Sequence, residues 1–155
     1  MNKWLGFDIT EVPGGAVESP QLRTLPGSDR LASWAEADLG VVYVVGRGFW
    51  SNDVVDAHFR ELRRTAAFVR RSNTVIKVLV DLRDASVQSP AVAAKIKNET
   101  RLIWSDADRI AVVLQSALAR MQITRVVNSG NHASFVALED ARSWLGLKPR
   151  ERLRA

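Results

Sequence analysis

Side chains that could carry out chemistry are few in this sequence, and they lie far apart. There are two histidines, His58 and His132, and no cysteine. Without thiolates or clustered histidines, a metal site has no visible ligand set, and thiol catalysis is excluded. Four aspartates fall at predicted strand or helix ends, where capping and loop solvation explain them: Asp81, Asp84, Asp106 and Asp108. The sequence therefore predicts no catalytic centre, no metal site and no cofactor.

Two pairs of polar residues lie where parallel strands are predicted to end. Asp81 and Asp84 stand at the end of one predicted strand, and Ser86 and Ser89 follow before a predicted helix. Ligand crevices in α/β sheets lie at the carboxyl ends of the strands, so these four residues are candidates for contacting a partner or a ligand. Ser89 also precedes Pro90, an order typical of a helix start with a serine cap.

The segment Gly46-Arg-Gly48 has only part of a phosphate-binding pattern. It lacks the Walker lysine and a complete G-x-G-x-x-G run, so it gives weak support for a nucleotide site. Phe49 and Trp50 follow it, ahead of a predicted helix. A loop aromatic can close a core or anchor an interface, and the sequence favours neither role for this pair. His58 lies on that helix, where we expect a partly buried structural imidazole.

The elements that must hold these residues alternate along the chain. Apolar periodicity, caps and breakers predict a hairpin of strands 31–35 and 41–45, a helix from 51 or 52, a strand over 75–82, a helix from 89 or 90, a strand over 109–114, a helix over 116–128, a strand over 133–136 and a helix over 138–145. Strands that alternate with helices need crossovers, which favour parallel pairing. We therefore predict an α/β fold in one domain, with a mixed, mostly parallel sheet of about four or five strands and about four helices.

The order of these segments resembles the STAS family, the domain of sporulation anti-sigma-factor antagonists, in a branch whose last helix ends Ala-x-x-Trp-Leu. The match runs from about Leu31 to Leu145. The residues that carry it are Val42–Gly46, Val78–Leu82, Ile110–Val113, Phe135, Ala141, Trp144 and Leu145. The resemblance implies a regulatory module that binds a protein partner and is not an enzyme. Its contact surface is expected at the start of the second helix.

The family's regulatory motif has an Asp-Ser-Ser/Thr-Gly type sequence after the strand that ends in Asp-Leu, and a partner kinase phosphorylates its serine. This chain reads Arg83-Asp-Ala-Ser-Val-Gln-Ser-Pro-Ala91 there and departs from that motif. Asp81 keeps the strand-end acid, and Ser89 is the nearest hydroxyl. Capping explains a serine before Pro90, so we expect no phosphorylation at Ser89.

Two segments flank the predicted domain of residues 29–146. Residues 1–28 form an N-terminal arm, with a short strand expected over 3–10 and a run rich in proline and glycine after it. Its apolar side chains predict that it covers an edge of its own sheet or pairs with a second copy across a two-fold dimer: Trp4, Leu5, Phe7 and Ile9. Residues 147–155 form a basic tail that holds +3 of the net charge of +5. Because the charge gathers in a tail, we expect no nucleic-acid binding.

The remaining expectations concern compartment and ligand. No apolar run approaches the roughly 18 residues that span a bilayer, and the first residues lack the pattern of a secretory signal. The absence of cysteine fits a reducing cytoplasm. The alternative function is a carrier or sensor of a small apolar ligand, by analogy with the CRAL-TRIO lipid-carrier fold. That alternative requires a pocket of roughly 300 Å³ or more.

Overall fold

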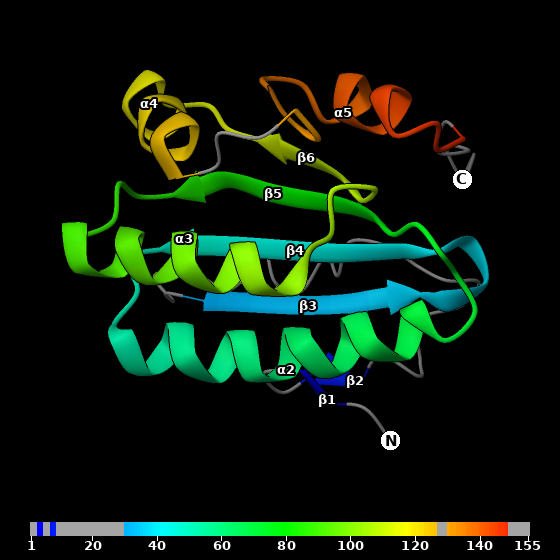
Figure 1. The fold of residues 1–155 in the computed structure, drawn as a ribbon. Helices are drawn as coiled ribbons and strands as arrows, with labels where there is room; N and C mark the ends of the chain where they lie inside the picture. Colours follow the sequence, from blue (N-terminus) through cyan, green and yellow to red (C-terminus); the bar gives the residue numbers. More distant parts are fainter. Residues whose placement is uncertain (1–2, 5–6, 9–29, 127–129, 149–155) are drawn as a thin grey trace.

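The computed structural model describes residues 3–4, 7–8, 30–126 and 130–148. The elements of the main unit, labelled as in Figure 1, are β3 (Arg30–Glu36), the 3-10 helix η2 (Ala37–Leu39), β4 (Val41–Gly48), α2 (Asn52–Arg70), β5 (Lys77–Ala85), α3 (Pro90–Ile103), β6 (Arg109–Val113), α4 (Ala117–Val126), β7 (His132–Phe135) and α5 (Leu138–Trp144). The strands form one sheet in the order β3-β4-β5-β6-β7. β3 and β4 are antiparallel, and the other neighbours are parallel. The predicted α/β class and mixed sheet are confirmed.

The strand ends differ from the prediction at one important place. β4 and β5 each continue three residues beyond their predicted ends, to Gly48 and Ala85. They stay paired there, because Arg47 lies opposite Asp84 and Gly48 opposite Ala85 after a register shift. The Gly46-Arg-Gly48 segment is therefore strand and not a loop. β5 also begins at Lys77, two residues after its predicted start.

The two terminal segments are described only in part. Where one strand was expected over residues 3–10, the described residues form two short antiparallel strands, β1 (Lys3–Trp4) and β2 (Phe7–Asp8). The rest of the arm, residues 149–155 of the tail and the last two residues of the helix predicted over 116–128 lie outside the described residues.

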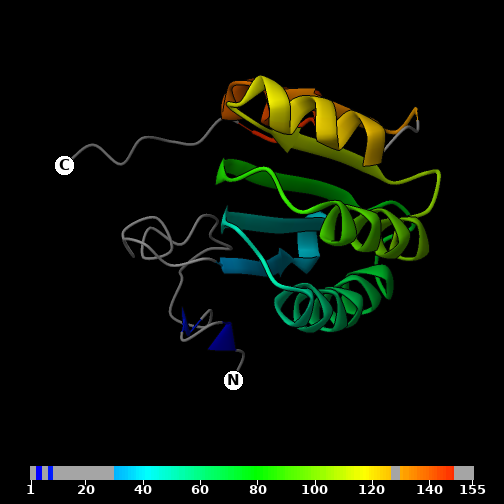
Figure 2. The same ribbon diagram turned by 90° about the vertical axis from the view of Figure 1, so that its left-hand side faces the viewer.

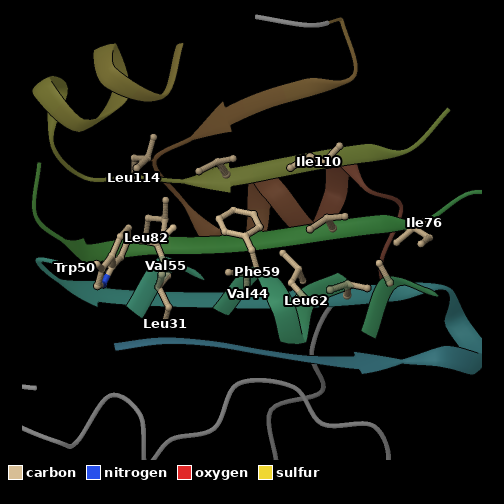
Figure 3. Close-up of a cluster of buried hydrophobic side chains, with 14 of the residues drawn as sticks. Leu31, Val44, Trp50, Val55, Phe59, Leu62, Ile76, Leu82, Ile110 and Leu114 are labelled. Carbon is tan, nitrogen blue, oxygen red and sulfur yellow. The ribbon is translucent and has the colours of Figure 1, made fainter. Parts of the chain in front are cut away.

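Three helices cover one face of the sheet. α2, α3 and α4 pack there over a cluster of buried side chains, which we call the first core cluster. Figure 2 shows α2 and α3 side by side on this face. The apolar positions of α2 recur every three or four residues, as an amphipathic helix requires. They are Val55, Phe59, Leu62, Ala66 and Val69. They meet Val44, Val78 and Ile110 of the strands (Figure 3). Continuous β-branched runs form these strands because both of their faces are buried.

The other face of the sheet explains the Ala-x-x-Trp-Leu ending. Ala141 and Leu145 are fully buried in a second core cluster with strand residues of that face. Trp144 lies at the margin of this cluster, with its ring 5.9 Å from that of Phe135. The guanidinium of Arg109 stacks on the Trp144 ring at 4.1 Å, which is a cation–π contact. The motif therefore docks α5 onto the sheet.

Gly46 is required by a close contact within the first core cluster. A Cβ atom at this position would lie 2.6 Å from Cζ2 of Trp50 and 2.7 Å from Cδ2 of Leu82. The indole is held in place, because its Nε1 donates to the carbonyl oxygens of Arg47 at 2.7 Å and Arg30 at 3.1 Å. The ring therefore lies directly over the backbone of β4, and only glycine leaves room for it.

Asp108 joins three elements at the opposite end of the sheet. Its fully buried carboxylate accepts two hydrogen bonds from Arg70 at the end of α2, at 2.9 and 2.7 Å. It also accepts the backbone N–H groups of Ile76 and Ser105, both at 2.9 Å. Burial alone would raise the pKa of this carboxyl, but the hydrogen bonds from Arg70 and the two N–H groups outweigh it and hold the pKa below its usual range.

We expect Gly46→Ala to destabilise the fold by about 1–3 kcal/mol, the usual cost of overpacking a filled core. Urea unfolding measures the change. The matched control is Gly130→Ala, because a Cβ at Gly130 meets nothing within 4 Å. Equal stability of the two variants would contradict the contact between Trp50 and Gly46.

We expect Asp108→Asn to cost about 3 kcal/mol, because it leaves Arg70 without its carboxylate and replaces one of the two acceptor oxygens with an NH2 group that cannot accept a backbone N–H. Asp106→Asn, at an exposed position two residues away, should change stability by less than about 0.5 kcal/mol. The contribution of Asp108 to the free energy of unfolding is fully present above the pKa of an unfolded aspartate. It is lost as the pH falls through the lowered pKa that Asp108 has in the folded chain. Urea unfolding at neutral and acidic pH tests both statements, and a variant that loses no more than Asp106→Asn would contradict them.

Candidate functional site

The loops that follow the parallel strands gather at one edge of the sheet. β4, β5, β6 and β7 run in the same direction, so their carboxyl ends meet at the left of Figure 1. From these ends, residues 49–51 lead into α2, 86–89 into α3, 114–116 into α4 and 136–137 into α5. We call these four loops the carboxyl edge. α/β folds bind their ligands at this edge, so the candidate site is built here.

Gln88 connects two of these loops. Its side chain is buried, and Oε1 accepts the backbone N–H of Trp50 at 2.8 Å. Its Nε2 donates to the carbonyl oxygens of Gly48 at 2.9 Å and Ser86 at 2.6 Å. One amide therefore bonds three backbone groups where β4 and β5 end. The Gly48 carbonyl accepts the Ser86 N–H as well. The sequence analysis missed Gln88, because glutamine in a loop is usually exposed.

A second glutamine ties α4 to the same point. The backbone N–H of Gln88 donates to Oε1 of Gln122 at 3.1 Å, and Nε2 of Gln122 donates to the backbone carbonyl of Gln88 at 2.9 Å. This reciprocal pair resembles one step of a β-ladder, made by a side chain. The loop before α3 is thus fixed to β4 on one side and to α4 on the other.

The two loop aromatics have different environments. Trp50 is a core residue, and its side chain closes the first core cluster at the carboxyl edge. Phe49 is 51% exposed. Of the two roles left open by the sequence, core closure applies to Trp50, and Phe49 is the residue placed where a partner could reach it.

Ser86 and Ser89 lie in the loop between β5 and α3, as the sequence predicted. Ser86 is exposed, and its backbone N–H donates to the carbonyl of Gly48 at 3.0 Å. The Ser89 hydroxyl accepts the backbone N–H of Val92 at 3.2 Å and caps α3, whose first residue is Pro90. The capping role expected for Ser89 is confirmed.

Asp81 and Asp84 do not join these serines in one cluster. Asp81 is buried, and its carboxylate accepts hydrogen bonds from Nη2 of Arg83 at 2.6 Å and from Nε of Arg83 at 2.9 Å. By the alternation of β5, Asp81 shares the face of Leu79, which belongs to the cluster under α5. It therefore lies on the opposite side of the sheet from the start of α3. Asp84 is exposed near the end of β5, where it pairs with Arg47 of β4.

Exposed apolar side chains surround the carboxyl edge. Six of the large apolar residues that remain exposed lie in its loops or in the first turns of the helices that follow: Phe49, Val54, Val87, Leu118, Met121 and Val136. We call this set the apolar rim. It combines residues from four separate loop-to-helix junctions, so only Phe49 was singled out from the sequence. An exposed apolar set around one edge marks a surface suited to association.

A cavity of about 110 Å³ lies between the sheet and the three helices of that face. Apolar side chains of the first core cluster form most of its wall, including Val78, Ile96 and Ile110. Its volume is well below the roughly 300 Å³ that ligand pockets usually offer. The alternative of a carrier for an apolar ligand is therefore not favoured.

Both histidines border this cavity. His58 is buried on α2, with its ring 5.2 Å from that of Phe59, and burial lowers the pKa of His58 to about 4. Burial also lowers the pKa of His132 to about 4. Both imidazoles are neutral at pH 7, and His58 is the structural residue that the sequence predicted. Among the described residues, no group of three side chains could hold a metal ion, and no helix is long and apolar enough to cross a membrane.

The comparisons with known proteins concern the fold. No protein-family model and no curated protein matches the chain. Solved structures, among them the following two, are similar to it in fold. An uncharacterised protein of the DUF3478 family with a SpoIIAA-like fold, from Shewanella loihica, is 19% identical, and the match covers 77% of this chain and 96% of that one with a TM-score of 0.60. An anti-sigma factor antagonist from Mycobacterium paratuberculosis is 15% identical, with coverages of 78% and 97% and a TM-score of 0.56. The chain therefore has the SpoIIAA-like fold of STAS-like domains.

Proposed function

We propose that this chain is a non-catalytic regulatory module that binds a protein partner through its carboxyl edge. The observation that carries the proposal is the apolar rim, whose exposed side chains lie at the four loop-to-helix junctions of the carboxyl edge. Phe49 is the anchor, because an aromatic side chain at the centre of an interface contributes most of the binding energy. Ser86 and Ser89 lie beside it and supply polar contacts. Trp50 supports this surface from within the core.

The similarity to an anti-sigma factor antagonist supports a regulatory role. The side chains that could carry out catalysis are otherwise engaged. Ser89 caps α3, the carboxylate of Asp81 is bound by Arg83, and the buried imidazole of His58 is neutral. None of them forms the hydrogen-bonded nucleophile and base that an active site requires. We therefore propose a module in which the surface of the carboxyl edge, and not a reaction, carries the function.

Phosphorylation is not part of this proposal. The Ser89 hydroxyl already accepts the Val92 N–H as a cap, and capping accounts for its position before Pro90. We predict that Ser89 is not phosphorylated in the native host, and intact-mass spectrometry of protein from that host tests this prediction.

The experiment is affinity purification from the native host with the tagged full chain, followed by measurement of binding to the protein that it captures. The captured protein must bind the purified chain directly, with a dissociation constant in the micromolar range or below. A purification that recovers no directly binding protein would contradict the proposal.

We expect Phe49→Ser to weaken binding of that partner at least tenfold, because truncating an aromatic anchor typically costs about 2 kcal/mol or more. The matched control is Leu39→Ser. Leu39 is 61% exposed, comparable with Phe49, but it lies in η2, before the start of β4 and away from the carboxyl edge. Calorimetric titration of both variants measures the effect. Equal affinities would show that the partner binds elsewhere.

We expect Gln88→Ala to destabilise the chain by about 2–3 kcal/mol, because it removes the hydrogen bonds of a buried side chain to the Trp50 N–H and the Ser86 carbonyl. The same substitution should speed hydrogen exchange at the amide of Trp50, which Gln88 Oε1 accepts. The amide of Ile76, bound by Asp108 at the other end of the sheet, is the internal control. Exchange that speeds equally at both amides would contradict a local role for Gln88.

A further inference from the structure

The exposed side of α2 carries a stripe of arginines. Arg60, Arg63, Arg64 and Arg71 recur, with Ala67 between them, at spacings of three or four residues, which places them on one side of the helix. Residues 60–71 hold five arginines and a single glutamate, a net charge of +4 in a chain whose total is +5. Residues 29–146 sum to +3, so the domain outside residues 60–71 sums to −1, and these twelve residues hold the excess positive charge of the domain.

A hollow of about 520 Å³ lies beside this stripe, between the last turns of α2 and α3. Its floor is apolar and is formed by Ala66, Ala67 and Ile103. Its sides are formed by Arg63, Arg70, Arg71 and Leu102. We call these seven residues the arginine groove. The Leu102 side chain is 76% exposed, and Phe68, adjacent to the groove on α2, is 57% exposed.

Some of the arginines are already paired with carboxylates. Arg70 binds Asp108, and Nη2 of Arg63 lies 2.9 Å from Oε2 of Glu99 on α3. Among the described residues, no carboxylate pairs with Arg60 or Arg71, and both are exposed. Two guanidinium groups therefore remain available at the two ends of the stripe. Arg71 lines the groove, and Arg60 lies one turn before Arg63, where the groove begins on α2.

We propose that the arginine groove binds an acidic amphipathic helix of a partner protein. The apolar side of such a helix would cover Ala67, Leu102 and Phe68, as helix-in-groove recognition requires. Its carboxylates would reach Arg60 and Arg71, since guanidinium groups bind carboxylates in a bidentate manner. A nucleic acid would use only the arginines. It would leave the apolar floor uncovered and bring phosphates toward the Glu99 carboxylate.

This surface is separate from the carboxyl edge. α2 begins at the carboxyl edge and rises by about 1.5 Å per residue, so its 19 residues extend about 28 Å to the groove end. The inference does not rest on the function proposed above, and a partner at the apolar rim leaves the groove accessible.

The experiment uses the isotope-labelled full chain and a synthetic helical peptide of about 16 residues, a length of about 24 Å. The peptide has leucines along one side and glutamates on the others. We expect amide shift changes in α2 from Arg60 onwards and in the last two turns of α3, with none at Phe49 or Val87. The Arg60→Glu, Arg71→Glu double variant should bind at least tenfold more weakly, and raising the salt concentration should weaken binding by the wild type.

The matched control is the Arg120→Glu, Lys148→Glu double variant, which changes the net charge equally but at exposed positions on α4 and after α5. Circular dichroism checks that both double variants are folded. A second peptide with the same composition but scattered leucines should bind at least tenfold more weakly. The proposal is overturned if no binding occurs up to about 100 µM, if the shifts map to the carboxyl edge, or if the control variant loses as much affinity. If a single-stranded oligonucleotide binds more tightly than the peptide, the proposal is also overturned, because the surface then binds a nucleic acid and not an acidic helix.

Discussion

Parallel strands end in backbone groups that must find partners away from water, and here the side chain of Gln88 supplies partners for two loops at once. These hydrogen bonds of Gln88 position two further features of the carboxyl edge. Because Gln88 holds the N–H of Trp50, the indole stays over Gly46 and closes the core. Because its backbone pairs with Gln122, α4 is kept beside α3. The side chains of the apolar rim near these loops therefore extend from backbone that hydrogen bonds hold in place.

Composition and surface give different impressions of this chain. By composition, residues 29–146 and the tail each carry +3 and the arm carries −1, so no part of the chain stands out by its net charge except the short tail. In the folded chain, five arginines occur within residues 60–71, and the burial of Asp108 against Arg70 removes one carboxylate from the surface. Charge segregation of this kind arises from helix periodicity, which places residues three and four apart on one side. Net charge alone therefore conceals a directional surface.

Much of the fold was predictable from local patterns, and the site was predictable only in part. β-branched runs gave the strands, and Ser89 before Pro90 gave the start of α3 to the residue. Pairings across the chain were not predictable. Arg70 and Asp108 are 38 residues apart, and no periodicity links them. The burial of Gln88 has no local sequence pattern either. Asp81 was expected at the carboxyl edge, but the alternation of β5 turns its side chain to the other face.

The buried imidazole of His58 makes folding a proton-linked reaction. In the unfolded chain this ring has a pKa near 6.5, whereas in the fold its pKa is about 4. Between these values the unfolded chain binds a proton that the folded chain does not, so acidification favours unfolding and the free energy of unfolding rises with pH. A single site of this kind can change stability by up to about 3 kcal/mol across the interval. Mild acidification therefore lowers the free energy of unfolding through this buried ring.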